Sequence, residues 1–261
     1  MRGWSEPYRI SVGLGIRQLA RRRHLREAVI RVVVPMDPSR YLELPWAARR
    51  LSPAPGESVL DLASPKLLCV VLARRGARVT SVDQLPGEIE TWRSLARDEP
   101  NLELRVADGR SLPFEDASFD HGSSISVIEH VGGDGGDAAA LAELARCVRP
   151  GGRVAVTLPY AREAWIEYHR SAAYVDEGER SPDGAAFFQR WYDDAELERL
   201  VGAVGSLEVV ERDVVRLAPN LSAAYNRTFP LLVPLGPFYG LLARERVGEE
   251  GDVVRLLLER R

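Results

Sequence analysis

The 261-residue sequence has few of the residues or segments that metal sites, membrane-spanning helices and signal peptides require. Its two cysteines, Cys69 and Cys147, lie in apolar stretches without a CxxC spacing or a histidine cluster, so we expect reduced thiols and no metal site. The nearest candidate for a membrane-spanning helix, 229–243, is too short and is interrupted by prolines and glycines. The first ten residues lack the apolar centre of a signal peptide, so we expect a cytoplasmic protein.

Lysine is almost absent, because Lys66 is the single lysine among 35 basic residues. The net charge of −3 does not favour a polyanionic partner, and we expect no nucleic-acid partner. Residues 1–50 nevertheless hold eleven arginines against four acids. This basic arm is compatible with peripheral contact to a membrane surface and equally with a solvated helix face.

The first 50 residues predict accessory helices. Apolar residues recur at helical spacing over 19–32 and predict one helix, which two prolines then end. A second, short helix is expected over 41–51, before a turn rich in proline.

A different pattern begins after residue 57, where short apolar runs alternate with helical patterns. Ser64 and Pro65 predict the start of the first of these helices, with Ser64 as the N-cap. Successive strand–helix units predict a parallel sheet with helices on both faces. The expected strands are 58–62, 79–83, 102–107, 119–124 and 153–158.

Three acids, Asp61, Asp83 and Asp108, stand at or just after the ends of expected strands. Parallel strands present their carboxyl ends at one edge of a sheet, where ligands bind, so we expect these acids to line one crevice. A carboxylate can accept both hydroxyls of a ribose, and the spacing between Asp61 and Asp83 suits such a site. The alternative is that each acid caps the helix that follows it.

Together these segments resemble the class I S-adenosylmethionine-dependent methyltransferases. The segments that carry the resemblance are 59–63, 82–83, 107–114, 119–120, 124–130, 144–152 and 187–193. The resemblance implies an α/β fold with a Rossmann-like, doubly wound sheet of seven strands, the last antiparallel over 252–258. It also implies a methyltransferase-like domain over 51–261, with S-adenosylmethionine as cofactor and a small molecule as acceptor.

The resemblance further implies which residues hold the cofactor. Its methionine end is expected at Asp61, Ala63 and Ser64, its ribose at Asp83 and Gln84, its adenine at Asp108 and Gly109, and its reacting side at Ser124 and Ile125.

One departure concerns the loop after the first strand. Family members carry glycines at the positions that are Ala63, Pro65 and Leu67 here. Glycine permits close backbone approach and a positive φ, so we expect a tighter, more helical loop that still offers a helix N-terminus to the methionine carboxylate. Lys66 is expected either to add a charge near that carboxylate or to be a solvated first-turn lysine.

The candidate catalytic residues are Glu129 and His130, which follow the fourth strand. His130 titrates near neutrality and could take a proton from the acceptor. The alternative is that His130 hydrogen-bonds a loop backbone. The insertion 161–206 is rich in aromatic residues and predicts either a lid and acceptor pocket or a small satellite core.

Three functions stay open. The first is a small-molecule methyltransferase, for which the basic arm and the apolar 229–243 segment point toward an amphipathic acceptor. The second is a nicotinamide-dependent enzyme, which the missing glycines disfavour. The third is a non-catalytic binding module that kept the fold and lost the cofactor. The acceptor, the atom methylated and the oligomeric state are not specified by the sequence.

Overall fold

The computed structural model describes residues 3–170, 180–218, 244–248 and 251–261. The apolar segment 229–243 and Tyr174 of the aromatic insertion lie outside the described residues.

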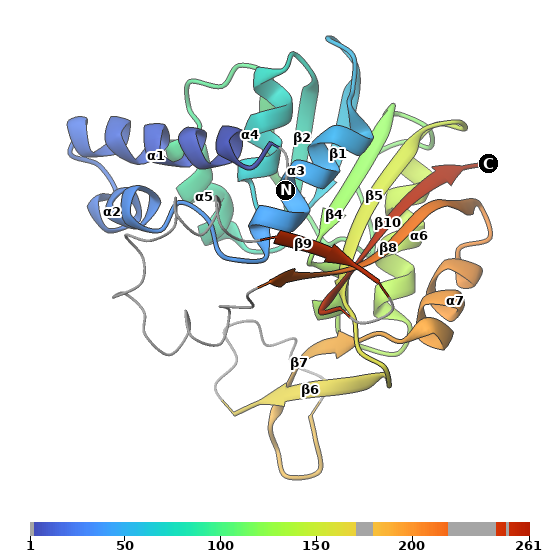
Figure 1. The fold of residues 1–261 in the computed structure, drawn as a ribbon. Coiled ribbons are helices and arrows are strands. Elements are labelled where there is room, and N and C mark those ends of the chain that lie inside the picture. Colours follow the sequence, from blue (N-terminus) through green and yellow to red (C-terminus); the bar gives the residue numbers. More distant parts are fainter. Residues whose placement is uncertain (1–2, 171–179, 219–243, 249–250) are drawn as a thin grey trace.

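An eight-stranded sheet in the order β3-β2-β1-β4-β5-β10-β8-β9 forms the centre of the described structure (Figure 1). Its parallel strands are β1 (Ser58–Leu62), β2 (Arg78–Asp83), β3 (Leu102–Val106), β4 (His121–Ile125) and β5 (Arg153–Pro159). Next, β10 (Val253–Arg260) runs antiparallel between β5 and β8 (Leu207–Ala218), which confirms the antiparallel last strand. One strand, β9 (Arg244–Val247), extends the expected set of seven by pairing with β8.

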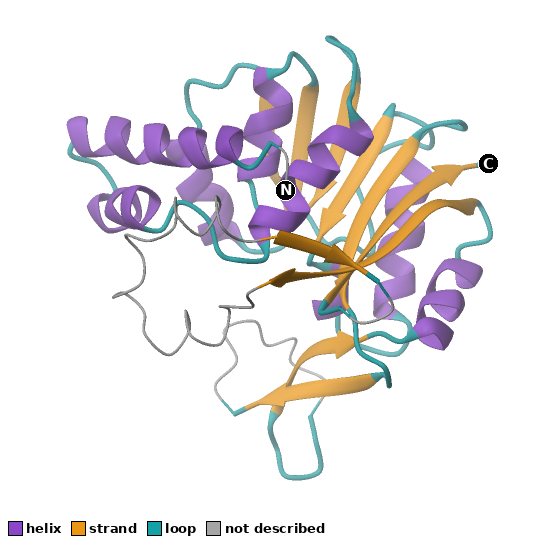
Figure 2. Ribbon diagram, in the orientation of Figure 1, coloured by secondary structure: helices purple, strands orange, loops and turns teal. Residues whose placement is uncertain are grey.

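Helices cover both faces of the sheet, so the doubly wound architecture is confirmed (Figure 2). One buried cluster joins the sheet to α4 (Leu67–Arg74) and α5 (Pro86–Leu95), and the other joins it to α6 (Gly136–Cys147) and α7 (Asp194–Ala203). The two cysteines are free and buried, one in each cluster, as expected. Burial raises the pKa of the Cys147 thiol to about 11.

The N-terminal region contains three helices, α1 (Ser5–Ala20), α2 (Leu25–Val33) and α3 (Arg40–Leu51). The prediction of one helix across 19–32 is wrong, because the chain turns sharply between α1 and α2. Arg22 and His24 there adopt φ values of +53° and +45°, which no helix contains. The short helix expected over 41–51 is confirmed as α3, and it packs into the same buried cluster as α4.

The predicted start of α4 is also wrong. The helix begins at Leu67, after Lys66, and Ser64 does not cap it. Ser64 is fully buried, and its hydroxyl instead accepts a hydrogen bond of 2.9 Å from the backbone N–H of Ile125. A long-range contact to the tip of β4 thus replaces the local cap that the sequence suggested.

A two-stranded hairpin, β6 (Trp165–His169) and β7 (Ala186–Trp191), lies below the large sheet in Figure 1. It packs β7 against η1 (Ile128–His130), a short 3₁₀ helix that follows β4. The hairpin therefore brings the insertion to the carboxyl end of β4. No helix among the described residues is long and apolar enough to cross a bilayer.

Candidate active site

The acid at the tip of β1 lies inside the sheet. Asp61 is fully buried, and its two oxygens accept hydrogen bonds of 2.7 Å from the hydroxyls of Ser81 on β2 and Ser123 on β4. The carboxylate thereby joins three neighbouring strands. Its role at the methionine end of a cofactor stays a prediction.

The acid at the tip of β2 forms a buried ion pair. Lys66 Nζ donates to Asp83 Oδ2 at 2.9 Å and to the carbonyl oxygen of Ser64 at 3.1 Å. The other oxygen, Asp83 Oδ1, accepts from the backbone N–H of Leu85 at 3.0 Å. Burial disfavours the charge on Lys66, but Asp61 and Asp83 together hold the pKa of its ammonium above the ordinary value. The expectation of a solvated Lys66 is wrong.

The residues expected at the adenine lie closer to solvent. Asp108 is exposed, and Arg110 binds its carboxylate in a bidentate manner, with a shortest contact of 2.9 Å. The hydrogen bonds from Arg110 lower the pKa of Asp108. A Cβ at Gly109 would lie 2.8 Å from Leu62 Cδ1, so the side chain of Leu62 would have to shift to admit one. Gln84, at the tip of β2, is exposed.

The loop after β1 keeps the conformation that glycine normally permits. Ala63 has a φ of +52°, in the left-handed region. Ser64 binds the backbone of Ile125, and the hydroxyl of Ser124 donates to the carbonyl oxygen of Leu62 at 3.3 Å. The structure therefore brings four predicted site residues together between the tips of β1 and β4: Ala63, Ser64, Ser124 and Ile125.

Glu129 and His130 lie on η1, beyond the tip of β4. His130 Nδ1 lies 2.7 Å from the carbonyl oxygen of Phe188, so Nδ1 donates and the neutral ring keeps Nε2 as its basic nitrogen. Burial, together with the charge of Arg40, lowers the pKa of His130. The backbone contact that the sequence left open is present, and it orients the ring.

Glu129 is buried, and its surroundings favour the protonated carboxyl. Burial raises its pKa to about 8, and the nearby carboxylate of Glu43 adds to the shift. Its Oε1 lies 3.8 Å from His130 Nε2, while its buried Oε2 has no hydrogen-bond partner. An unpaired buried oxygen is costly, and its presence beside a histidine is typical of a functional site.

One further polar group at this place comes from α3 and was missed by the sequence interpretation. Glu43 is fully buried and pairs with Arg40 at 2.5 Å. Its Oε1 accepts from the hydroxyls of Thr157 on β5, at 2.7 Å, and of Ser126. The sequence signal for this residue is a single acid, Glu43, inside an otherwise apolar helical segment.

One aromatic ring of the β6–β7 hairpin contacts His130. Phe188 meets the His130 ring edge-on at 5.0 Å and stacks on His169 at 4.2 Å. Elsewhere on the hairpin, Trp165 and Trp191 stack on each other at 5.5 Å. The insertion thus places the ring of Phe188 next to His130.

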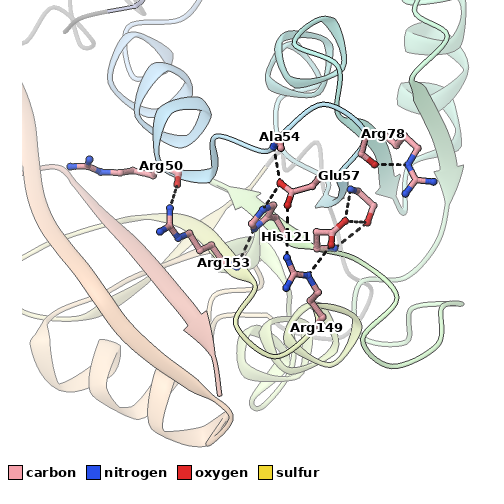
Figure 3. A network of polar contacts seen from close by, with 10 residues as sticks. Arg50, Ala54, Glu57, Arg78, His121, Arg149 and Arg153 are labelled. Carbon is pink, nitrogen blue, oxygen red and sulfur yellow. Dashed lines mark hydrogen bonds and ion pairs between the residues drawn. The ribbon is translucent and has the colours of Figure 1, made fainter.

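A second polar network lies at the opposite end of the parallel strands, where β1 and β4 begin (Figure 3). Glu57 accepts from the backbone N–H of Ala54 at 2.7 Å and lies 3.2 Å from His121 Nε2. Hydrogen bonds from Ser58 lower the pKa of Asp120 to about 2. These contacts join the N-terminal ends of β1 and β4. The predicted site lies at the other, carboxyl end of the same strands.

Comparison with known proteins identifies the family. A methyltransferase domain model matches residues 60–156. The demethylmenaquinone methyltransferase of Corynebacterium kroppenstedtii is 30% identical over 195 residues, which cover 70% of this chain and 80% of the relative. The chain belongs to the class I S-adenosylmethionine-dependent methyltransferases.

Solved methyltransferase structures share the fold at low sequence identity. A methyltransferase of Methanosarcina mazei superposes with a TM-score of 0.56 at 14% identity, covering 84% of this chain and 99% of that one. The geranyl diphosphate C-methyltransferase of Streptomyces coelicolor superposes with a TM-score of 0.55 at 15% identity, covering 84% and 75%. Family membership makes the protein a methyltransferase whose cofactor is S-adenosylmethionine, which removes the nicotinamide alternative.

The described residues fit this cofactor only in part. The left-handed conformation of the loop at Ala63 suits close approach of a ligand to the backbone at the tip of β1. The ribose end does not fit as the side chains lie, because the Asp83 side chain is only 8% exposed and its Oδ2 is paired with the buried Lys66.

Proposed function

We propose that the methyltransferase modifies a small, amphipathic acceptor and that His130 removes the acceptor's proton. The observation that carries this proposal is the pair formed by the buried Glu129 and the half-buried His130, whose Oε1 and Nε2 lie 3.8 Å apart beyond the tip of β4. The ring of Phe188 beside His130 suits a flat, apolar acceptor. The relatives named for demethylmenaquinone and geranyl diphosphate support an acceptor of this kind.

The chain's own residues would bind and deprotonate the acceptor. When bound, S-adenosylmethionine supplies an activated methyl group, so the protein mainly aligns the reacting groups. The lowered pKa of His130 favours its neutral ring, whose Nε2 can accept a proton from an acceptor hydroxyl. Glu129, once ionised, would stabilise the imidazolium formed.

Methyl transfer from labelled S-adenosylmethionine to apolar hydroxylated acceptors, the reduced, hydroquinone form of demethylmenaquinone among them, tests this proposal. We expect His130→Ala to lower kcat by about 10²–10⁴-fold. The wild-type rate should rise as the pH passes 8, where Glu129 ionises, and Glu129→Gln should lack this rise. His121→Asn, in the opposite network, is the matched control. Full activity of His130→Ala, or no transfer to any such acceptor, contradicts the proposal.

We further propose that α1 and α2 contact an anionic membrane surface. Leu25, Val29 and Val33 recur every four residues along one face of α2, and each is at least 40% exposed. The exposed arginines Arg23 and Arg26 lie beside this apolar face. An apolar stripe next to cationic side chains complements anionic lipid headgroups.

Sedimentation with lipid vesicles tests the membrane contact. We expect binding to vesicles that contain phosphatidylglycerol and little binding to pure phosphatidylcholine. The double variant Leu25→Ser/Val29→Ser should lose at least about 10-fold in affinity, since two buried aliphatic side chains contribute more than 1.4 kcal/mol. Val210→Ser, equally exposed on β8, is the control. Equal binding of both variants contradicts the contact.

A further inference from the structure

The single lysine of the chain occupies an unusual place. Thirty-four of the 35 basic residues are arginines, yet Lys66 stands in the loop that follows β1. It is 2% exposed, and its ammonium lies within hydrogen-bond distance of Asp83 and the Ser64 carbonyl. The compact ammonium of lysine, carried on a flexible aliphatic chain, differs in shape and donor geometry from the rigid, planar guanidinium of arginine.

The ion pair uses the carboxylate that a ribose would need. Asp83 Oδ2 is bound by Lys66 and Oδ1 by the backbone of Leu85. The Asp83 side chain is only 8% exposed, and Lys66 is packed against its Oδ2. A ribose diol that binds both oxygens of Asp83 therefore competes with the ammonium for Oδ2.

Displacing Lys66 has a large cost unless the ligand provides a new anion. Removing one partner from a buried ion pair leaves an uncompensated charge, which is strongly destabilising. A ligand carboxylate within reach of the loop would restore the lost pairing.

We propose that Lys66 selects adenosyl ligands that carry an amino-acid carboxylate, by exchanging its ion pair with Asp83 for one with that carboxylate. This proposal rests on the function proposed above, because it concerns the same cofactor site. In the free protein, Lys66 holds the Asp83 oxygen that a bidentate ribose contact needs. S-adenosylmethionine and S-adenosylhomocysteine can complete the exchange, whereas 5′-methylthioadenosine, which has no carboxylate, leaves the ammonium unpaired.

Calorimetric titration with S-adenosylhomocysteine and 5′-methylthioadenosine tests the exchange without any turnover. We expect the wild type to prefer S-adenosylhomocysteine and Lys66→Met to reduce that preference at least 10-fold, chiefly by binding 5′-methylthioadenosine more tightly. Arg105→Met, which removes an exposed cation on β3, is the control and should leave the preference unchanged.

Lys66→Met leaves Asp83 buried without its cation and could unfold the protein for that reason, so a second variant is included. Lys66→Met/Asp83→Asn removes both charges and should show the same loss of preference. An unchanged preference in the folded variants overturns the exchange while leaving the methyltransferase proposal intact. If no variant and no wild-type protein binds either ligand, the exchange and the cofactor-dependent function are both overturned.

Discussion

At the scale of single residues, the strand-tip acids differ in what surrounds them. Asp61 is buried between two serine hydroxyls, whereas Asp108 is exposed and paired with Arg110. A buried carboxylate with fixed donors contributes to folding, while an exposed ion pair contributes little. The sequence presents both as an acid after a strand, so it does not distinguish these roles.

The contrast predicts unequal effects of removing each acid. Asp61→Ala leaves the hydroxyls of Ser81 and Ser123 without their acceptor, and we expect it to lower the free energy of unfolding by about 2–5 kcal/mol. Asp108→Ala should lower it by about 1 kcal/mol or less. Urea denaturation followed by circular dichroism measures both, and similar losses for the two variants would contradict this assignment.

At the scale of elements, the closeness of α1 and α2 depends on one glycine. A Cβ on Gly15 would lie 2.6 Å from the carbonyl oxygen of Ala28 and 2.8 Å from Val32 Cγ2. Backbone cannot move away as a flexible side chain can, so the two helices must separate if Gly15 gains a side chain. Gly13, on the same helix, has no such neighbour within 4 Å.

The two glycines therefore form a matched pair of substitutions. We expect Gly15→Ala to destabilise the protein by about 1–3 kcal/mol through overpacking. Gly13→Ala should be neutral or stabilise it by up to about 1 kcal/mol, because alanine favours the helix. Thermal unfolding compares the variants, and a Gly15→Ala protein as stable as Gly13→Ala would exclude the close helix contact.

At the scale of the whole molecule, α3 connects the first and last parts of the chain. Trp46 is 1% exposed within the buried cluster of α4, and its indole N–H donates to Glu211 on β8 at 3.2 Å. Arg50 pairs with the same carboxylate at 2.8 Å. Through Glu43, the same helix also reaches the tips of β4 and β5. The boundary expected at residue 50 stays a prediction, but α3 is part of the common core.

Trp46→Ala tests how far folding depends on α3. We expect a loss of about 3–5 kcal/mol in the free energy of unfolding, because a large buried ring is replaced by a cavity. Trp165→Ala is the control, since Trp165 is 48% exposed and should cost about 1 kcal/mol through its stacking on Trp191. Guanidinium denaturation measures both variants. A small loss for Trp46→Ala would mean that α3 is dispensable to the core.

The sequence by itself determined the parallel strands, the covering helices and the positions of the acids. These features follow from apolar periodicity and turn residues within short windows, which act locally on the backbone. Only the tertiary structure decided that Lys66 pairs with Asp83, 17 residues away, and that Glu43 reaches Thr157, 114 residues away. Such contacts depend on strand order and helix docking, so no local pattern specifies them.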